Sequence, residues 1–193
     1  MNNRRYLLVA AIAVALVQIG FLVTMITGRA AILRDGTEIL LKTEPVDPRD
    51  LLRGDYVVLS YGISVLPAEL IQSAYDGDEE QGDRTIYVRL APDADGFHQP
   101  VAARLDHPPE AEKGPEEVDV RGMVRSWAAG RQHGFFVDYG IERYYVPEGE
   151  GLAIEEGMME RDFVMRVAVS ASGTAQIRSF HDDGRLLYEE PWY

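Results

Sequence analysis

Few side chains in this sequence could carry hydrolytic chemistry. A serine–lysine pair, the catalytic unit of signal peptidases, needs a lysine that is buried deeply enough to deprotonate the serine. The chain has two lysines, Lys42 and Lys113, and Lys113 lies in a charged, proline-rich stretch. The histidines are His98, His107, His133 and His181. They fall in expected turns and loops with no nucleophile elbow nearby, so the sequence predicts no catalytic residue.

Ligands for a metal or a cofactor are not predicted either. The chain has no cysteine, which excludes disulfides, thiolate zinc sites and iron–sulfur clusters. The histidines lack the paired spacing of zinc sites. The acidic run at residues 76–83 departs from the calcium-loop pattern because Gln81 stands where glycine is needed. A phosphate-binding glycine motif is also missing, and we therefore expect no metal and no cofactor.

The formal net charge of −13 is unevenly distributed along the chain. The first acidic residue is Asp35, whereas Arg4 and Arg5 stand close to the N-terminus. An acidic surface repels nucleic-acid phosphates, so this charge excludes nucleic acid as a partner.

The most distinctive stretch is residues 54–61, GDYVVLSY. Its glycine and aspartate predict a tight turn that leads into a strand. Candidate interaction residues are Gly54, Asp55, Tyr56, Leu59 and Tyr61, together with the preceding charged residues Arg49, Asp50 and Arg53. Alternation along the strand would place Val57, Leu59 and Tyr61 on one face. The motif is therefore open to two interpretations, a structural turn and strand or a contact site for a partner.

This stretch fits the pattern GDYxxLxY at every specified position and resembles the GDYXXLXY protein family of bacteria, whose members are membrane-anchored. The surroundings are similar as well, with a leading hydrophobic helix, PVDPRD at residues 45–50 and YVPE at residues 145–148. The resemblance covers most of the chain. It implies a membrane-anchored protein and no particular mechanism.

The N-terminal region has the length and composition of a membrane anchor. Residues 6–26 are almost entirely apolar, and about 20 residues at ~1.5 Å each span a ~30 Å hydrocarbon core. A cleaved signal peptide is the alternative, but residues 28–30 (GRA) make a poor cleavage site. We predict a cytoplasmic N-terminus at residues 1–5 and a transmembrane helix at residues 6–27.

The positions of the arginines give the expected orientation. Arg4 and Arg5 precede the apolar run, and Arg29 and Arg34 follow it. The positive-inside rule favours a cytoplasmic N-terminus for this arrangement. The exported domain, residues 28–193, is then expected on the periplasmic side of the bacterial inner membrane.

Beyond the anchor, short apolar runs alternate with glycine, proline and aspartate, which is typical of β structure. Candidate strands lie at residues 38–43, 56–61, 85–91, 101–105, 117–123, 134–139, 143–146, 162–169, 175–180 and 185–188. We therefore predict a mainly β domain, either a β-barrel or two packed sheets.

Two pairs of segments recur within this domain. Residues 57–63 and 135–141 both end in Tyr-Gly-Ile, and residues 85–96 align without a gap to residues 162–173. The spacing is about 78 residues, which predicts an internal duplication with repeats at about 37–105 and 115–190. The alternative is that these segments resemble each other only because all β sequences share an alternating pattern. Different strand orders in the two halves would contradict a duplication.

Together these features predict a non-enzymatic binding or accessory module that acts with integral membrane proteins or envelope components. The alternative is a membrane-tethered hydrolase or peptidase with an unrecognised site. A passive structural domain is a third interpretation.

Overall fold

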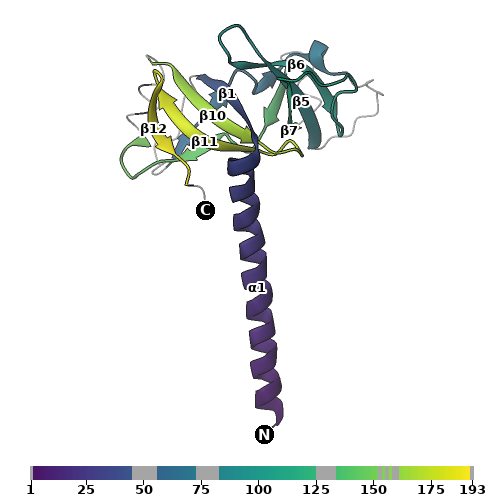
Figure 1. Ribbon diagram of the computed structural model, residues 1–193, viewed down its shortest axis with the longest axis vertical. Helices are drawn as coiled ribbons and strands as arrows, with labels where there is room; N and C mark the ends of the chain where they lie inside the picture. The colour runs from purple at the N-terminus through teal and green to yellow at the C-terminus, as the bar shows by residue number, and fades with distance from the viewer. Residues whose placement is uncertain are drawn as a thin grey trace.

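The computed structural model describes residues 2–44, 56–72, 83–124, 134–151, 154, 157 and 161–191. One long helix, α1 (Asn2–Asp35), carries a β domain at its C-terminal end (Figure 1). The helix is long and apolar enough to cross a membrane. Its apolar part is exposed on all sides, as the lack of a polar face predicts.

The helix continues past the predicted span and its last turns pack on the domain. Leu33 is buried there, and the chain turns at Gly36 into strand β1 (Thr37–Glu44). A Cβ atom at position 36 would lie 2.5 Å from the Ile32 carbonyl oxygen, so only glycine fits this turn. The helix therefore joins the sheet without a linker.

The described strands of the domain form two five-stranded sheets and a two-stranded sheet, all antiparallel. The first sheet has the order β12 (Arg185–Glu189), β11 (Ala175–Asp182), β10 (Phe163–Val169), β1 and β3 (Ser60–Tyr61). The second has the order β4 (Val65–Leu66), β8 (Phe135–Asp138), β7 (Val118–Val124), β5 (Arg84–Pro92) and β6 (His98–Leu105). The small sheet pairs β2 (Tyr56–Val58) with β9 (Arg143–Tyr145).

The predicted fold class is confirmed in its two-sheet form, and the described strands do not close into a barrel. Each predicted strand segment contains an observed strand. The segment at 56–61 divides at Leu59 into β2 and β3, and β4 is an additional short strand followed by a 3-10 turn at Ala68–Leu70. A single apolar cluster fills the space between the sheets with side chains from both.

Each sheet combines strands from both halves of the sequence. In the first sheet β1 of the first half pairs with β10 of the second, and in the second sheet β7 of the second half pairs with β5 of the first. The order β11-β10-β1-β3 thus repeats as β6-β5-β7-β8. The two halves have the strand order that a duplication predicts, and they are interlocked.

The registers of the two hairpins agree in detail. The β5–β6 hairpin pairs Pro92 with His98 and has an irregularity after Arg89. The β10–β11 hairpin makes the same pairs about 77 residues later, with its irregularity after Arg166. Both turns contain a glycine at φ 85°, Gly96 and Gly173. Shared alternation alone would not reproduce a bulge at matching positions.

Candidate functional site

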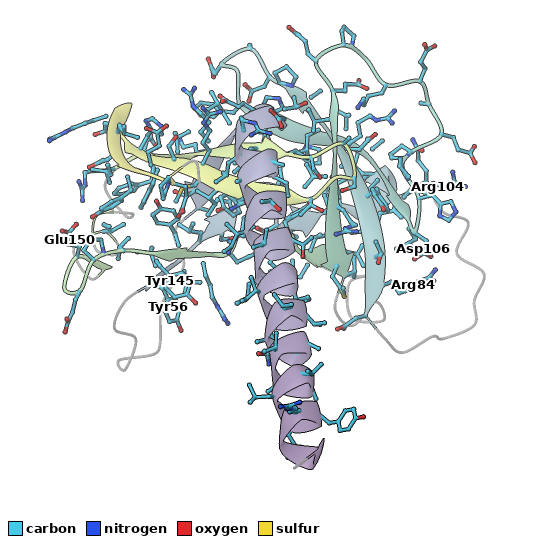
Figure 2. The ribbon with its side chains drawn as sticks, turned by 60° about the horizontal axis from the view of Figure 1, so that its bottom comes forward. Tyr56, Arg84, Arg104, Asp106, Tyr145 and Glu150 are labelled. Atoms are coloured by element: carbon cyan, nitrogen blue, oxygen red, sulfur yellow. The ribbon has the colours of Figure 1, made fainter. Side chains whose placement is uncertain are left out.

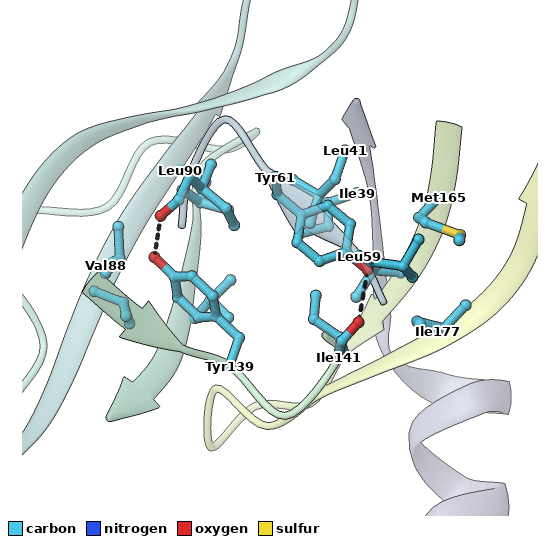
Figure 3. Packing of buried hydrophobic residues seen from close by; sticks show 14 of the residues in the cluster. Ile39, Leu41, Leu59, Tyr61, Val88, Leu90, Tyr139, Ile141, Met165 and Ile177 are labelled. Carbon is cyan, nitrogen blue, oxygen red and sulfur yellow. Dashed lines mark hydrogen bonds between the residues drawn. The ribbon is translucent and has the colours of Figure 1, made fainter. Parts of the chain in front are cut away.

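The end of the sequence motif lies at the centre of the interlocked fold. Tyr61 donates its hydroxyl to the Ile141 carbonyl at 2.7 Å (Figure 3). Tyr139 donates its hydroxyl to the Ile63 carbonyl at 2.9 Å. Each Tyr-Gly-Ile segment therefore binds the other across the two halves. Burial raises the pKa of both tyrosines well above the ordinary value, which keeps the two hydroxyls protonated as donors.

Backbone contacts around these tyrosines are reciprocal as well. Leu59 N donates to the Glu142 carbonyl and Val137 N donates to the Ser64 carbonyl, both at 2.9 Å. The Ser64 hydroxyl accepts from Tyr61 N at 3.0 Å, and at the matching place Glu142 Oε1 accepts from Tyr139 N at 2.5 Å. In their described contacts, Leu59 and Tyr61 are core residues that join the two repeats.

Glu142 is the acidic residue of this group, and its pKa is shifted as well. Burial raises the pKa of its carboxyl group to about 7. The neighbouring Asp138 contributes to this rise through a hydrogen bond and like charge, while the hydrogen bond from the Tyr139 amide lowers the pKa. The Asp138–Glu142 pair therefore holds a proton to higher pH than isolated carboxyl groups do.

The start of the motif strand faces outward. Tyr56 lies opposite Tyr145 in the β2–β9 pair, with ring centroids 5.9 Å apart. The Arg143 guanidinium carbon stands 5.7 Å from the centroid of the Tyr56 ring, a cation–π distance. We call Tyr56, Arg143 and Tyr145 the aromatic–arginine cluster. Figure 2 shows Tyr56 and Tyr145 side by side on the face of the domain from which α1 emerges.

Beside this cluster lies a cavity of about 430 Å³, which we call the helix-side pocket. The helix contributes Arg29 and Ile32, and β9 contributes Arg143 and both of its tyrosines. The wall is completed by residues 139–141, by residues 174–177 at the start of β11 and by Glu190. The pocket thus lies where the helix meets the sheet.

Helix and sheet are joined at the same place by an ionic junction. Glu38 on β1 accepts from Arg166 at 3.2 Å and forms a second ion pair with Arg178. Arg178 also donates to the Leu33 carbonyl of the helix at 3.4 Å. The Arg178 side chain is only 16% exposed, whereas Glu38 and Arg166 are 36% and 44% exposed.

A second cavity, of about 370 Å³, lies on the other sheet, and Figure 2 shows three of its residues, Arg84, Arg104 and Asp106. Arg84 pairs with Asp106 at 2.5 Å, and Arg104 pairs with Glu110 at 2.9 Å. The positive and negative charges balance, so this cavity has no net preference for an anion or a cation.

One serine–histidine pair bears on the hydrolase interpretation. Ser179 Oγ and His181 Nε2 lie 2.8 Å apart on β11, and burial lowers the pKa of His181. Ser179 is 4% exposed, and neither residue lines a cavity described above. A nucleophile must reach its substrate, so this pair lacks the access that hydrolysis needs. Among the residues that the structure describes, no three His, Asp or Glu side chains form a metal site.

The remaining motif residues, Arg49, Asp50, Arg53, Gly54 and Asp55, lie outside the described residues, as does His133. The interaction role predicted for the motif therefore stays a prediction. The aromatic–arginine cluster was not predicted from the sequence, because it unites residues from β2 and β9 that are far apart along the chain.

Comparison with known proteins supports the resemblance drawn from the motif. The family model described as GDYXXLXY protein matches residues 18–180, which is most of the chain. Comparisons with curated proteins and with solved structures found no match.

Proposed function

The chain belongs to the GDYXXLXY family, and we propose that it is a single-pass protein of the bacterial inner membrane. Its N-terminus lies in the cytoplasm and its β domain on the periplasmic side. The domain acts as a binding or accessory module for integral membrane proteins or envelope components.

The observation that carries this proposal is the junction between helix and domain. The helix enters β1 through a single glycine, packs Leu33 into the domain and is held by the hydrogen bond from Arg178 to the Leu33 carbonyl. A flexible linker would let the domain explore the space around its anchor. A direct junction instead holds one face of the domain close to the membrane, which suits a protein that acts on partners in or on the membrane.

Exposed aromatic side chains favour binding over chemistry. Tyr145 is 73% exposed and Phe136 is 68% exposed, and they lie in β9 and β8. Aromatic residues on a surface are typical of protein interfaces, where they lose water and gain packing. The buried Ser179–His181 pair offers no comparable support for a hydrolase.

The absence of cysteine makes the orientation easy to test. We expect a single cysteine introduced at Ala111, which is exposed in the domain, to react with a membrane-impermeant maleimide in intact spheroplasts. An Asn2→Cys variant should react only after lysis. The reverse pattern would place the domain in the cytoplasm and contradict the proposal.

Partner binding is tested by photo-crosslinking of the full-length protein in cells. A photoreactive residue at Phe136 or Tyr145 should give discrete adducts with membrane or envelope proteins, and one at the exposed Glu112 should not. The same experiment with an Asp55→Ala variant that remains folded tests whether the motif takes part in partner binding. Identical adducts at all three positions, or none, would contradict the binding role.

A further inference from the structure

We propose that the helix-side pocket binds the phosphate of an anionic phospholipid headgroup. This inference rests on the proposed function, because it requires α1 to span the membrane. It adds lipid to the partners of the domain and assigns residues to its recognition.

The position of the pocket along α1 sets its depth. Arg29 follows the last apolar residue of the run, Ile26, by three residues, and Ile32 follows by six. At ~1.5 Å per residue, Arg29 stands about 4.5 Å and Ile32 about 9 Å beyond the hydrocarbon boundary. The headgroup layer is roughly 5–8 Å thick on each side of the bilayer. The Arg29 end of the pocket therefore lies at the level of lipid phosphates.

The charge of the pocket suits an anion. Two guanidinium groups, of Arg29 and Arg143, face a single carboxylate, that of Glu190. The pocket is thus positive in a protein whose formal net charge is −13. Within the part of the chain that the structure describes, neither arginine forms an ion pair with an acidic side chain. Guanidinium groups bind phosphate oxygens through paired hydrogen bonds, and these two remain available to do so.

The aromatic–arginine cluster supplies the other component of a membrane-surface site. Tyr145 lines the pocket and is largely exposed to the side from which α1 emerges. Tyrosine concentrates at the membrane interface because its ring favours the apolar boundary and its hydroxyl favours water. The Tyr56 ring lies against the Arg143 guanidinium and orients it at the edge of the pocket.

The duplication provides an internal comparison. The pair Val58–Arg143 in β2–β9 corresponds to Phe136–Val65 in β8–β4, about 78 residues away in each case. By the same correspondence Tyr145 matches Pro67, and Tyr56 matches Gly134. The equivalent β8–β4 position on the other sheet thus lacks the arginine and both tyrosines. Since the shared fold needs none of these side chains, their presence beside the anchor indicates a role that depends on the membrane.

The test measures lipid binding by the full-length protein in a neutral detergent, using native mass spectrometry. Phosphatidylglycerol and phosphatidylcholine are titrated against the wild-type protein and against Arg29→Gln and Arg143→Gln variants. Arg185→Gln is the matched control, because Arg185 is exposed at the opposite end of β12 from Glu190. Glycerol phosphate is added as a competitor to distinguish a lipid site from a site for soluble phosphate.

We expect one phosphatidylglycerol to bind in preference to phosphatidylcholine, and each pocket variant to weaken that binding roughly fivefold. Arg185→Gln and glycerol phosphate should leave it unchanged. Equal weakening by all three variants, no preference between the lipids, or displacement by glycerol phosphate would each overturn the proposal. Carbonate extraction of cell membranes tests the anchor separately. An extractable protein would refute the anchored function, whereas a resistant protein without lipid preference would refute only the headgroup site.

Discussion

At the scale of single residues, the two central tyrosines have the clearest energetic role. The hydroxyl groups of Tyr61 and Tyr139 each donate a hydrogen bond to a buried carbonyl of the opposite repeat. If the hydroxyl is removed, no water can enter the packed core to bind that carbonyl in its place. The motif tyrosine at position 61 is thus explained by a hydrogen bond across the two halves. This contact favours the structural interpretation for that residue.

We predict that Tyr61→Phe and Tyr139→Phe each lower the free energy of unfolding by about 1–2 kcal/mol, because each leaves one buried carbonyl unpaired. Chemical denaturation of the detergent-solubilised protein measures this change. Tyr145→Phe is the control, since its exposed hydroxyl should contribute less than about 0.5 kcal/mol. A loss of stability in only one of the two variants, Tyr61→Phe or Tyr139→Phe, would show that the two hydrogen bonds are not energetically equivalent.

Glu142 leads to a prediction about pH. Its folded-state pKa is about 7, above the ordinary value of 4.5. The folded protein therefore binds more protons than the unfolded chain between these values, and stability due to this group falls as pH rises through that window. Below this pH window Glu142 is protonated in both the folded and the unfolded state, and above the window it is ionised in both.

A Glu142→Gln variant tests this linkage, because the amide oxygen can still accept from Tyr139 N without ever becoming charged. We expect the variant to be more stable than the wild type at pH 8 and to lose much of the decline between about pH 4.5 and 7. Thermal unfolding across this pH range measures both effects. An unchanged pH profile would mean that another group governs it.

At the scale of elements, the repeated hairpins allow a matched pair of substitutions. Gly96 and Gly173 have the same positive φ, but their surroundings differ. A Cβ atom at position 96 would meet nothing within 4 Å, whereas at position 173 it would stand 3.0 Å from the Arg121 backbone nitrogen. The β10–β11 turn is therefore packed against β7, and the β5–β6 turn is open.

We predict that Gly96→Ala costs about 1 kcal/mol of stability, from backbone strain alone. Gly173→Ala should cost roughly 2–4 kcal/mol, because crowding adds to the same strain. Denaturation of both variants side by side gives the difference. Equal costs would mean that the backbone around Arg121 moves aside freely.

Most of these elements could be predicted from the sequence. Period-two alternation and turn glycines located the long strands, and the gapless match of residues 85–96 with 162–173 predicted a duplication. Strand β4 has only two residues, Val65 and Leu66, which is too short for any periodicity to appear. The sequence also could not predict the exchange of strands between repeats. The alternation of apolar and polar residues in β1 is the same whichever hairpin β1 pairs with.

The candidate site was less accessible from the sequence. Arg143 and Tyr145 looked like ordinary outward residues of a strand, and Arg29 like a residue flanking the anchor. Only the β2–β9 pairing and the packing of α1 on the sheet bring them to one pocket. Sites assembled from separate elements depend on tertiary contacts, and a single sequence does not encode these as a pattern.

At the scale of the whole molecule, the interlocked halves and the direct helix junction make the protein a single structural unit. Neither sheet is built from one repeat, since β1 lies beside β10 and β7 lies beside β5. A first half without the second would expose the edge of β1 and the apolar face of its sheet. The anchor is covalently joined only to the first repeat, so the second is retained at the membrane through its contacts with the helix and through these shared sheets.

This arrangement predicts that the protein can be divided between its repeats and reassembled. We expect fragments 1–113 and 114–193, separated in the exposed loop before β7, to copurify when they are coexpressed. The first fragment alone should be degraded by added protease, because its strands lack their partners. The second fragment should reach the membrane fraction only when the first is present. A first fragment that resists protease by itself would show that the repeats fold independently, and that the exchanged strands are not what unites them.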